Sequence, residues 1–250
     1  MPKTFRPSAE HGRLISKLDS IGRLNADDRV AVAGLPLRTR TVDAGDDLVL
    51  EGSSPTECLV VLDGLLARYN LVRDGERQIH SFHIPGDLPD RDTLHVGVMD
   101  HSICALSSAR VAFIPHEAIT ALLNARPNIA VALWRDSIID GGIYRQWLTG
   151  VGRRSAKQRV AHLICETFVR MGAVGLAEND HFYFPVTQSQ LGDALGLTAV
   201  HVNRTLQELR QAGLITWKGT VVSVPDVEAL QHAGDFDRTY LHLRTSTASH

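Results

Sequence analysis

The feature that most constrains the fold is the stretch VTQSQLGDALGLTAVHVNRTLQELRQAGLI at positions 186–215. Thr187 and Thr198 each stand before a run with helical spacing, where threonine is a good N-cap residue. Gly196 lies between the runs and readily takes the left-handed conformation that ends a helix. Two short helices joined by a three-residue turn that contains glycine form a helix-turn-helix, whose second helix enters the major groove of DNA.

The second helix of this unit is amphipathic. Val202, Leu206 and Leu209 recur at helical spacing and form the stripe expected to face the core. The opposite face carries side chains that read base edges, since arginine pairs with guanine and asparagine or glutamine pairs with adenine. The residues expected to contact DNA are Thr187, Gln188, Ser189, Thr198, Ala199, Val200, His201, Asn203, Arg204, Gln207 and Lys218.

The flanking segments predict a winged helix. An amphipathic helix is expected over 156–171, a short strand over 182–186, and a hairpin around Lys218-Gly219 that places Lys218 near phosphate. Five Lys or Arg against one Glu between 152 and 170 give the helix a local charge of +4. Simple packing of two helices and a hairpin is the alternative, but the order of these elements is more specific than a turn alone.

The N-terminal half is punctuated by glycines between short stretches rich in β-branched and apolar residues, such as ECLVVLD at 57–63. RDGER at 73–77 predicts a hairpin turn, because Asp-Gly readily takes positive φ. RVAFIP at 110–115 is the expected last strand. Several short strands at regular spacing favour a small antiparallel barrel or sandwich.

A long helix is expected from Pro127 to about Thr149, after a short one that follows Pro115. Its apolar surface is broad enough to face the barrel on one side and a second copy of the chain on another. Asp140-Gly141-Gly142 interrupts any heptad seam, and each glycine costs about 1 kcal/mol against alanine. A close backbone approach or a bend would explain the glycines. The expected dimer contacts are Leu133, Ile138, Ile139, Gly142 and Ile143.

Over about Leu37 to Pro225, these features together resemble the Crp/Fnr family of bacterial transcription regulators. The helix-turn-helix stretch and the glycine pattern of AGDDLVLEGSSPTECLVVLDGLLARYNLVRDGERQIHSFHIPGD carry the resemblance. It implies an α+β fold with an N-terminal antiparallel β-roll, a long central dimerization helix and a C-terminal winged helix-turn-helix. It also implies a cytoplasmic homodimer on palindromic double-stranded DNA, with RNA polymerase as a further partner. The expected divisions are a sensor domain at 10–126, a dimerization helix and hinge at 127–152, a DNA-binding domain at 153–234 and a tail at 235–250.

The resemblance places Arg204 at the family's recognition arginine, so we expect it to contact a guanine. Val200 is a departure, because the family often has a glutamate there that accepts a hydrogen bond from cytosine. Valine cannot accept one and can instead contact a thymine methyl group. With Ala199 beside it, this chain is expected to read a half-site different from the usual one.

The sensor is expected to lack the usual cyclic AMP site. Family members that bind cyclic AMP have a Gly-Glu pair and then an Arg-Ser pair, and Pro89-Asp90 and His101-Ser102 stand near those positions. An imidazole is a poor substitute for a guanidinium on phosphate. The effector is therefore unknown, and the expected pocket residues are Asp90, His101 and Ser102.

Other sensing chemistries stay open at this point. The N-terminal cysteine cluster of the oxygen-sensing members is absent, so no iron–sulfur cluster is expected. Haem ligation would have to use Pro2 with His80 or His83. A histidine-lined pocket for an unknown metabolite and a roll without an effector are further alternatives. Thiol regulation would have to use the three separated cysteines, Cys58, Cys104 and Cys165.

Composition leaves two other classes of function to consider. The net charge is −2. Neither a leader segment nor a run of about 18 apolar residues is found, so no membrane partner is expected. A small metal-dependent enzyme would draw on Asp87, Asp90, Asp92, His95 and His101, but HExxH, GxSxG and P-loop motifs are missing, and we expect no enzyme. A ligand-binding module whose winged helix binds a protein partner is the second alternative. The tail after Asp235 lacks clear periodicity, and its end, RTSTASH at 244–250, is expected to fray.

Overall fold

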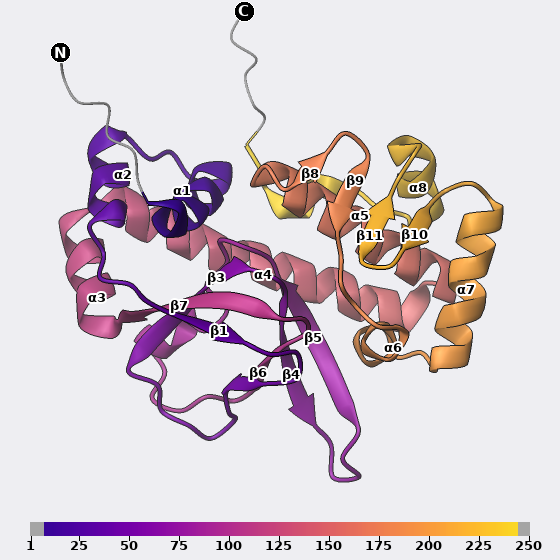
Figure 1. The fold of residues 1–250 in the computed structure, drawn as a ribbon, viewed down its shortest axis with the longest axis horizontal. Helices are drawn as coiled ribbons and strands as arrows, with labels where there is room; N and C mark the ends of the chain where they lie inside the picture. Colours follow the sequence, from indigo (N-terminus) through magenta and orange to yellow (C-terminus); the bar gives the residue numbers. More distant parts are fainter. Residues whose placement is uncertain (1–7, 245–250) are drawn as a thin grey trace, which may run out of the picture.

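The computed structural model describes residues 8–244 and has three parts in chain order, a β-roll, a long central helix and a winged helix (Figure 1). Two helices, α1 (Ala9–Ile21) and α2 (Ala26–Ala33), precede the roll and pack beside the start of the central helix. Ser8 caps α1 and Asn25 caps α2 through side-chain oxygens, which explains where each helix begins. Neither helix was expected from the sequence.

The β-roll consists of two antiparallel sheets, with strand orders β1-β7-β3 and β2-β6-β4-β5. The hairpin turn expected at 73–77 joins β4 to β5, and Gly75 has φ 82° there. The expected last strand lies within β7. The strands are β1 (Arg38–Val42), β2 (Asp47–Val49), β3 (Glu57–Asp63), β4 (Leu66–Leu71), β5 (Arg77–His83), β6 (Ser102–Ala105) and β7 (Ala109–Pro115).

Helix α4 (Pro127–Arg153) runs the length of the molecule behind the roll and follows the short α3 (His116–Ala125) (Figure 1). At 1.5 Å per residue it is about 40 Å long. The helix breaks at Arg154, and Ser155 caps the next helix with a capping box, so the hinge is only two residues long. The division expected between 152 and 153 lies close to this break.

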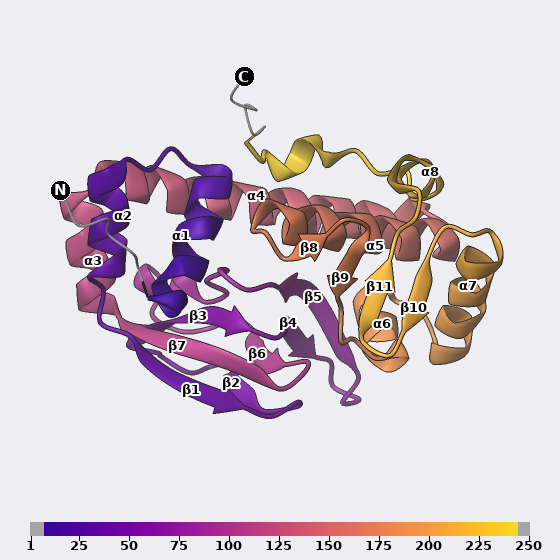
Figure 2. The same cartoon turned by 45° about the horizontal axis from the view of Figure 1, so that its top comes forward.

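The winged helix occupies one end of the molecule (Figure 2). Its sheet has the order β10-β11-β9-β8, and Gly219 turns the expected hairpin with φ 58°. The elements are α5 (Ala156–Ala173), β8 (Ala177–Glu178), β9 (His181–Tyr183), α6 (Gln188–Leu195), α7 (Ala199–Gln211), β10 (Thr216–Lys218), β11 (Val221–Ser223) and α8 (Val227–Ala233). The tail is described up to Arg244 and includes a 3-10 turn, η2 (Arg238–Leu241), although its sequence lacks clear periodicity. The residues expected to fray beyond Arg244, 245–250, and Pro2 lie outside the described residues.

One apolar cluster extends from β4 and β5 of the roll across α4 into the winged helix, while further clusters lie within the roll and its flanking helices. Phe82 of β5 lies with its ring centroid 5.5 Å from that of Trp147 in α4 and 5.8 Å from that of Phe184 in the winged helix. Both contacts are edge-to-face, with interplanar angles of 80° and 69°, as aromatic pairs prefer. The packing of these aromatic rings therefore helps to set the orientation of the winged helix relative to the roll.

Buried charges join the same parts. Asp87 lies after β5 and forms ion pairs with Lys17 of α1 at 2.7 Å and with Arg170 of α5 at 2.8 Å. Burial by itself would favour the protonated acid, but Lys17 and Arg170 outweigh it and hold the pKa of Asp87 well below its usual range. Asp87 is thus a structural anion that connects α1, the roll and the DNA-binding domain.

We expect Asp87→Asn to lower the free energy of unfolding by about 3–5 kcal/mol, because it removes from the interior the carboxylate that pairs with both Lys17 and Arg170. Urea unfolding followed by circular dichroism measures the change. Asp74→Asn at the exposed hairpin tip is the control and should alter stability by less than about 0.5 kcal/mol. A similar small effect at Asp87 would contradict its structural role.

Candidate DNA interface

The helix-turn-helix forms as the sequence predicts. Thr187 Oγ1 accepts from the Gln190 N–H at 3.2 Å while Gln190 Oε1 accepts from the Thr187 N–H, so α6 begins with a capping box. Gly196 ends α6 with φ 61°, and Thr198 Oγ1 accepts from the His201 N–H to start α7. These local bonds determine where the two helices begin and where α6 ends.

Gly192 is a second glycine that the turn requires, and sequence reasoning did not single it out. A side-chain carbon on Gly192 would collide with the backbone carbonyl of Leu197. The close approach of α6 to the turn is the reason, and the available signal was glycine inside an otherwise helical run.

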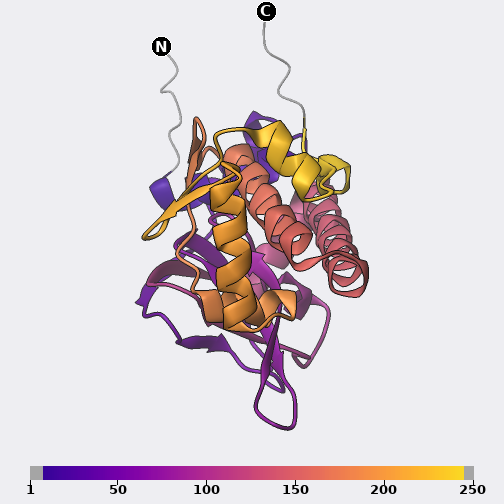
Figure 3. The ribbon, with the colours of Figure 1, turned by 90° about the vertical axis from the view of Figure 1, so that its right-hand side faces the viewer.

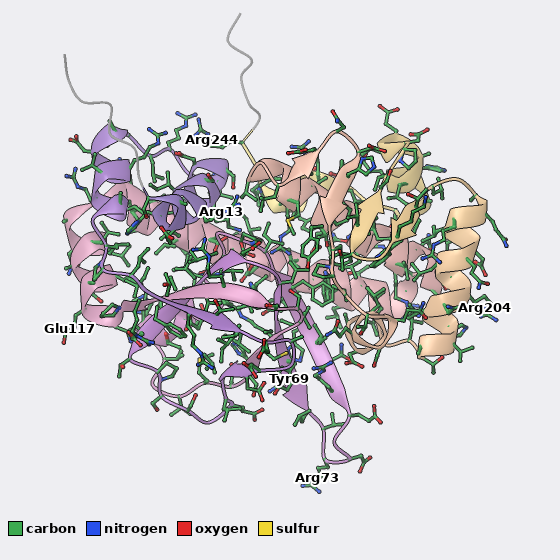
Figure 4. The ribbon with its side chains drawn as sticks, viewed as in Figure 1. Arg13, Tyr69, Arg73, Glu117, Arg204 and Arg244 are labelled. Atoms are coloured by element: carbon green, nitrogen blue, oxygen red, sulfur yellow. The ribbon has the colours of Figure 1, made fainter. Side chains whose placement is uncertain are left out.

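Helix α7 presents the expected face to the outside. Val202, Leu206 and Leu209 are buried, whereas Val200 is 82% exposed and the Arg204 side chain is 65% exposed. Figure 3 looks onto this end of the molecule and shows α7 lying across it, and Figure 4 shows Arg204 projecting outward from the helix. No part of the roll covers this face among the residues that the structure describes.

Three amides on this face are linked. Asn203 Nδ2 donates to Gln188 Oε1 at 3.2 Å, and Gln207 Nε2 donates to Asn203 Oδ1 at 3.1 Å. The links orient Asn203 before any base is present, and each can be exchanged for a base contact of the same type. Arg204 is held only loosely, since its Nε lies 4.0 Å from Glu208 Oε1.

The wing and the helix ends complete the surface. Lys218 is exposed at the tip of the β10–β11 hairpin, and Arg210 of α7 donates to the Trp217 carbonyl at 3.5 Å, which ties the wing to α7. Arg210 was not among the expected contacts. The structure leaves these further expected residues exposed at the starts of α6 and α7: Thr187, Ser189, Thr198, Ala199 and His201.

Most of the basic residues expected to add positive charge around α5 form ion pairs or hydrogen bonds within the chain. Arg170 is buried between Asp87 and Glu166. Arg154 bonds to Asp235, and Arg159 donates to the Leu195 carbonyl at 2.6 Å. The sequence could not show this, because it counts charges without their partners.

The expected effector-pocket residues are engaged within the roll. Asp90 is buried, its Oδ1 accepts from the Leu59 N–H at 2.7 Å, and burial raises its pKa to about 7. His101 Nδ1 lies 2.6 Å from Asp100 Oδ1, and Ser102 Oγ accepts from the Glu51 N–H at 3.0 Å.

Two arginines of the roll reach α4 instead. Arg68 of β4 donates to Asp140 at 3.2 Å and to the Tyr144 hydroxyl at 2.8 Å. Arg91 pairs with Asp140 at 2.7 Å and with Asp136 at 3.0 Å. The carboxylates of α4 therefore pair with the arginines of the roll where the roll packs against the central helix.

The expected dimer contacts require a correction. Leu133, Ile139, Gly142 and Ile143 are buried within the chain itself, because they face the roll, the winged helix and the tail. Ile138 alone of the five is exposed. The exposed apolar row of α4 has heptad spacing and passes through Gly141 and Arg145; its large apolar members are Val131, Trp134, Ile138 and Leu148, which are 61%, 70%, 47% and 74% exposed.

The three cysteines are buried on different elements, and none forms a disulfide. Burial raises the thiol pKa of Cys58 to about 12, of Cys104 to about 11 and of Cys165 to about 12. Thiols in this state are poor nucleophiles and poor metal ligands near neutral pH, because the reactive form is the thiolate. No group of three or more His, Cys, Asp or Glu within residues 8–244 is arranged to hold a metal ion.

Comparison with known proteins agrees with both halves of this architecture. Residues 39–126 match the cyclic nucleotide-binding domain family, and residues 158–233 match the Crp-like helix-turn-helix domain family. The chain belongs to the Crp/Fnr family of transcription regulators. Its curated relatives are regulators and not enzymes.

Two relatives illustrate the similarity. The transcriptional activator protein FnrA of Stutzerimonas stutzeri is 26% identical over 203 residues, which cover 81% of this chain and 83% of that protein. The fumarate and nitrate reduction regulatory protein of Escherichia coli K12 is 25% identical over 195 residues, 77% of each chain.

Solved structures support the same fold. FixK2 from Bradyrhizobium japonicum has a TM-score of 0.71 at 22% identity, covering 80% of this chain and 98% of that one. The c-di-GMP responsive regulator CLP of Xanthomonas campestris has a TM-score of 0.61 at 13% identity, covering 80% and 99%. A β-roll, a long helix and a winged helix are thus the family architecture.

We expect Arg204→Ala to weaken binding to the best DNA site by about 1–3 kcal/mol and to relax selectivity at one base pair of each half-site. Lys218→Ala should weaken binding to all sequences alike and reduce the salt slope by about one. Fluorescence anisotropy with matched and mismatched duplexes separates the two effects. Arg126→Ala at the α3–α4 junction is the control, and equal losses on all duplexes for Arg204→Ala would contradict its base-reading role.

Proposed function

We propose that the protein regulates transcription as a homodimer that binds palindromic double-stranded DNA, with α7 of each copy in the major groove. The single observation that carries the proposal is the outer face of α7, where Val200, Asn203 and Arg204 project from the end of the molecule beside an exposed wing lysine. The backbone N–H groups at the N-terminal end of α7 suit a phosphate.

The chemistry of this face favours a particular kind of half-site. Arg204 suits guanine O6 and N7, and Asn203 or Gln207 suits adenine. Val200 is the most exposed apolar side chain on α7 and offers contact to a thymine methyl group. We therefore propose a half-site that contains a guanine and at least one A·T pair, with no cytosine read at the Val200 position.

Dimerization is proposed along the exposed row of α4. Large apolar side chains at heptad spacing are what two parallel helices bury against each other. Trp134 and Leu148 leave most of their surface in solvent in the single chain, which makes this row the strongest candidate surface for a second copy. The proposed divisions remain a sensor domain, a dimerization helix and a DNA-binding domain at the boundaries given above.

The residues present do not fit a cyclic nucleotide held in the usual way. Asp90 and Ser102 already accept backbone hydrogen bonds, and His101 is paired with Asp100. Asp140 neutralises Arg68 and Arg91 and would have to be displaced by a ligand phosphate. We propose that any effector is of another chemical class.

An iron–sulfur cluster also does not fit these residues. Such clusters are held by about four cysteine thiolates, whereas this chain has three cysteines, all buried as thiols. RNA polymerase is proposed as a further partner, because one relative is named a transcriptional activator. No helix within residues 8–244 is long and apolar enough to cross a membrane. We propose a cytoplasmic location because the DNA target lies there.

Selection of the purified protein on randomised duplex DNA at physiological salt, followed by sequencing, tests the proposal. We expect enrichment of a palindrome with half-sites about one helical turn apart. Enrichment of a single asymmetric site would contradict binding as a symmetric dimer. The absence of any enrichment, both alone and with a cell metabolite extract, would contradict the DNA-binding proposal itself.

Ile138→Asp should convert the dimer into a monomer, because it places a charge at the centre of the exposed row where two copies would exclude water. Size-exclusion chromatography with light scattering measures the mass. Val30→Asp, on an exposed position of α2, is the matched control and should leave the mass unchanged. A dimer that survives Ile138→Asp would locate the interface elsewhere.

A further inference from the structure

The segment from Asp235 to Arg244, called here the C-terminal strap, returns from the winged helix to the sensor side of the molecule. After α8 it runs along α4 toward the end of α1, as the yellow segment in Figure 2 shows. It begins beyond the residues that match the Crp-like helix-turn-helix family, which end at 233. The strap is thus an addition of this chain to the matched domain.

One end of the strap is fixed to both helices of the hinge. The Tyr240 hydroxyl donates to Glu166 Oε2 of α5 at 2.8 Å, and the same carboxylate accepts from Trp147 Nε1 of α4 at 3.2 Å. His162 of α5 packs against two strap rings, with centroids 5.0 Å from Phe236 and 6.0 Å from Tyr240, and these two rings also contact each other at 5.9 Å. A single buried carboxylate therefore joins the strap to the helices on either side of the two-residue hinge.

The other end of the strap is fixed to the sensor domain. Arg244 donates through Nη1 to the Gly22 carbonyl at 2.9 Å, and its N–H donates to the Ser20 carbonyl at 2.9 Å. These are free carbonyls at the C-terminal end of α1, where an arginine is favourable. Arg135 of α4 donates to the His242 carbonyl at 3.1 Å, and Leu241 is completely buried. Figure 4 shows Arg244 beside the end of α1.

The central helix is shaped to receive the strap. A side-chain carbon at Gly142 would lie 3.0 Å from the Tyr240 carbonyl, so only glycine lets the strap come this close without a shift. This explains a glycine that costs stability in the middle of a long helix. The exposed row of α4, including Ile138, stays open with the strap in place.

We propose that the strap is a positioning element that holds the DNA-binding domain at a fixed angle to the dimer helix, with Tyr240 and Arg244 as its positioning residues. A dimer gains most from its second half-site when both α7 helices are already at the correct separation. The apolar cluster and the Asp87–Arg170 pair hold the DNA-binding domain against the roll, and the strap adds contacts that span the two-residue hinge from α5 to α1. This inference rests on the proposed dimeric binding to DNA.

The test compares a chain that ends at Gly234 with a control that ends at Arg244 and keeps every contact described above. The chain without the strap should bind the selected palindrome about tenfold more weakly, yet bind a duplex with one half-site as the control does. Insertion of one base pair between the half-sites should weaken DNA binding by the chain without the strap less than it weakens binding by the control. Equal losses on both duplexes, or no loss on the palindrome, would overturn the positioning role.

Point variants and a measurement without DNA complete the test. Tyr240→Phe and Arg244→Gln should each reproduce part of the effect, whereas Arg238→Gln should not, because Arg238 has no ion pair or side-chain hydrogen bond among the described residues. Trypsin should cut the hinge after Arg153 faster in the chain that ends at Gly234. If the wild type bound no DNA, faster cleavage would still support the strap, and unchanged cleavage would overturn it.

Discussion

The arrangement of this molecule depends on a carboxylate buried among cations from different elements. Asp87 follows the last strand of a hairpin, yet its partners are Lys17 from the first helix and Arg170 from the DNA-binding domain. Arg170 continues to Glu166, which accepts from Trp147 of the central helix and from Tyr240 of the strap. Taking such charges out of water is costly, so their contribution is to specify one arrangement more than to add stability. Sensor, central helix and winged helix are fixed relative to one another at one polar cluster.

A related cluster determines what the sensor can bind. Arg68 and Arg91 extend from the roll and are neutralised by Asp136 and Asp140 of the central helix. A cyclic nucleotide would have to compete with carboxylates that are already held at ion-pair distance in a buried setting, where such pairs are hard to separate. The same helix carries, on its other side, the exposed row proposed for dimerization, so a ligand that broke these pairs would act on a helix shared by both surfaces.

The DNA-reading surface has a different character, since it is built from local contacts. Its turn is set by threonine caps and by Gly192 and Gly196, and its outer side chains bond mainly to one another. The surface can therefore change its base preference, as Val200 indicates, without disturbing the core. The charged clusters behind it have no such freedom, because their members pair across different elements of the chain.

This contrast explains what could be predicted from the sequence. Helical spacing, caps and glycines are local signals, and they were sufficient for the helix-turn-helix, the wing, the hairpin at 73–77, the long helix and the family. Only the tertiary structure decided which face of α4 is free, since Leu133, Ile139 and Ile143 are as apolar as Ile138 but face other parts of the chain. It also decided that Arg170 is a buried ion-pair partner and that Gly142 receives the strap. Partners at these positions come from residues far apart in the chain, and spacing along one helix carries no information about them.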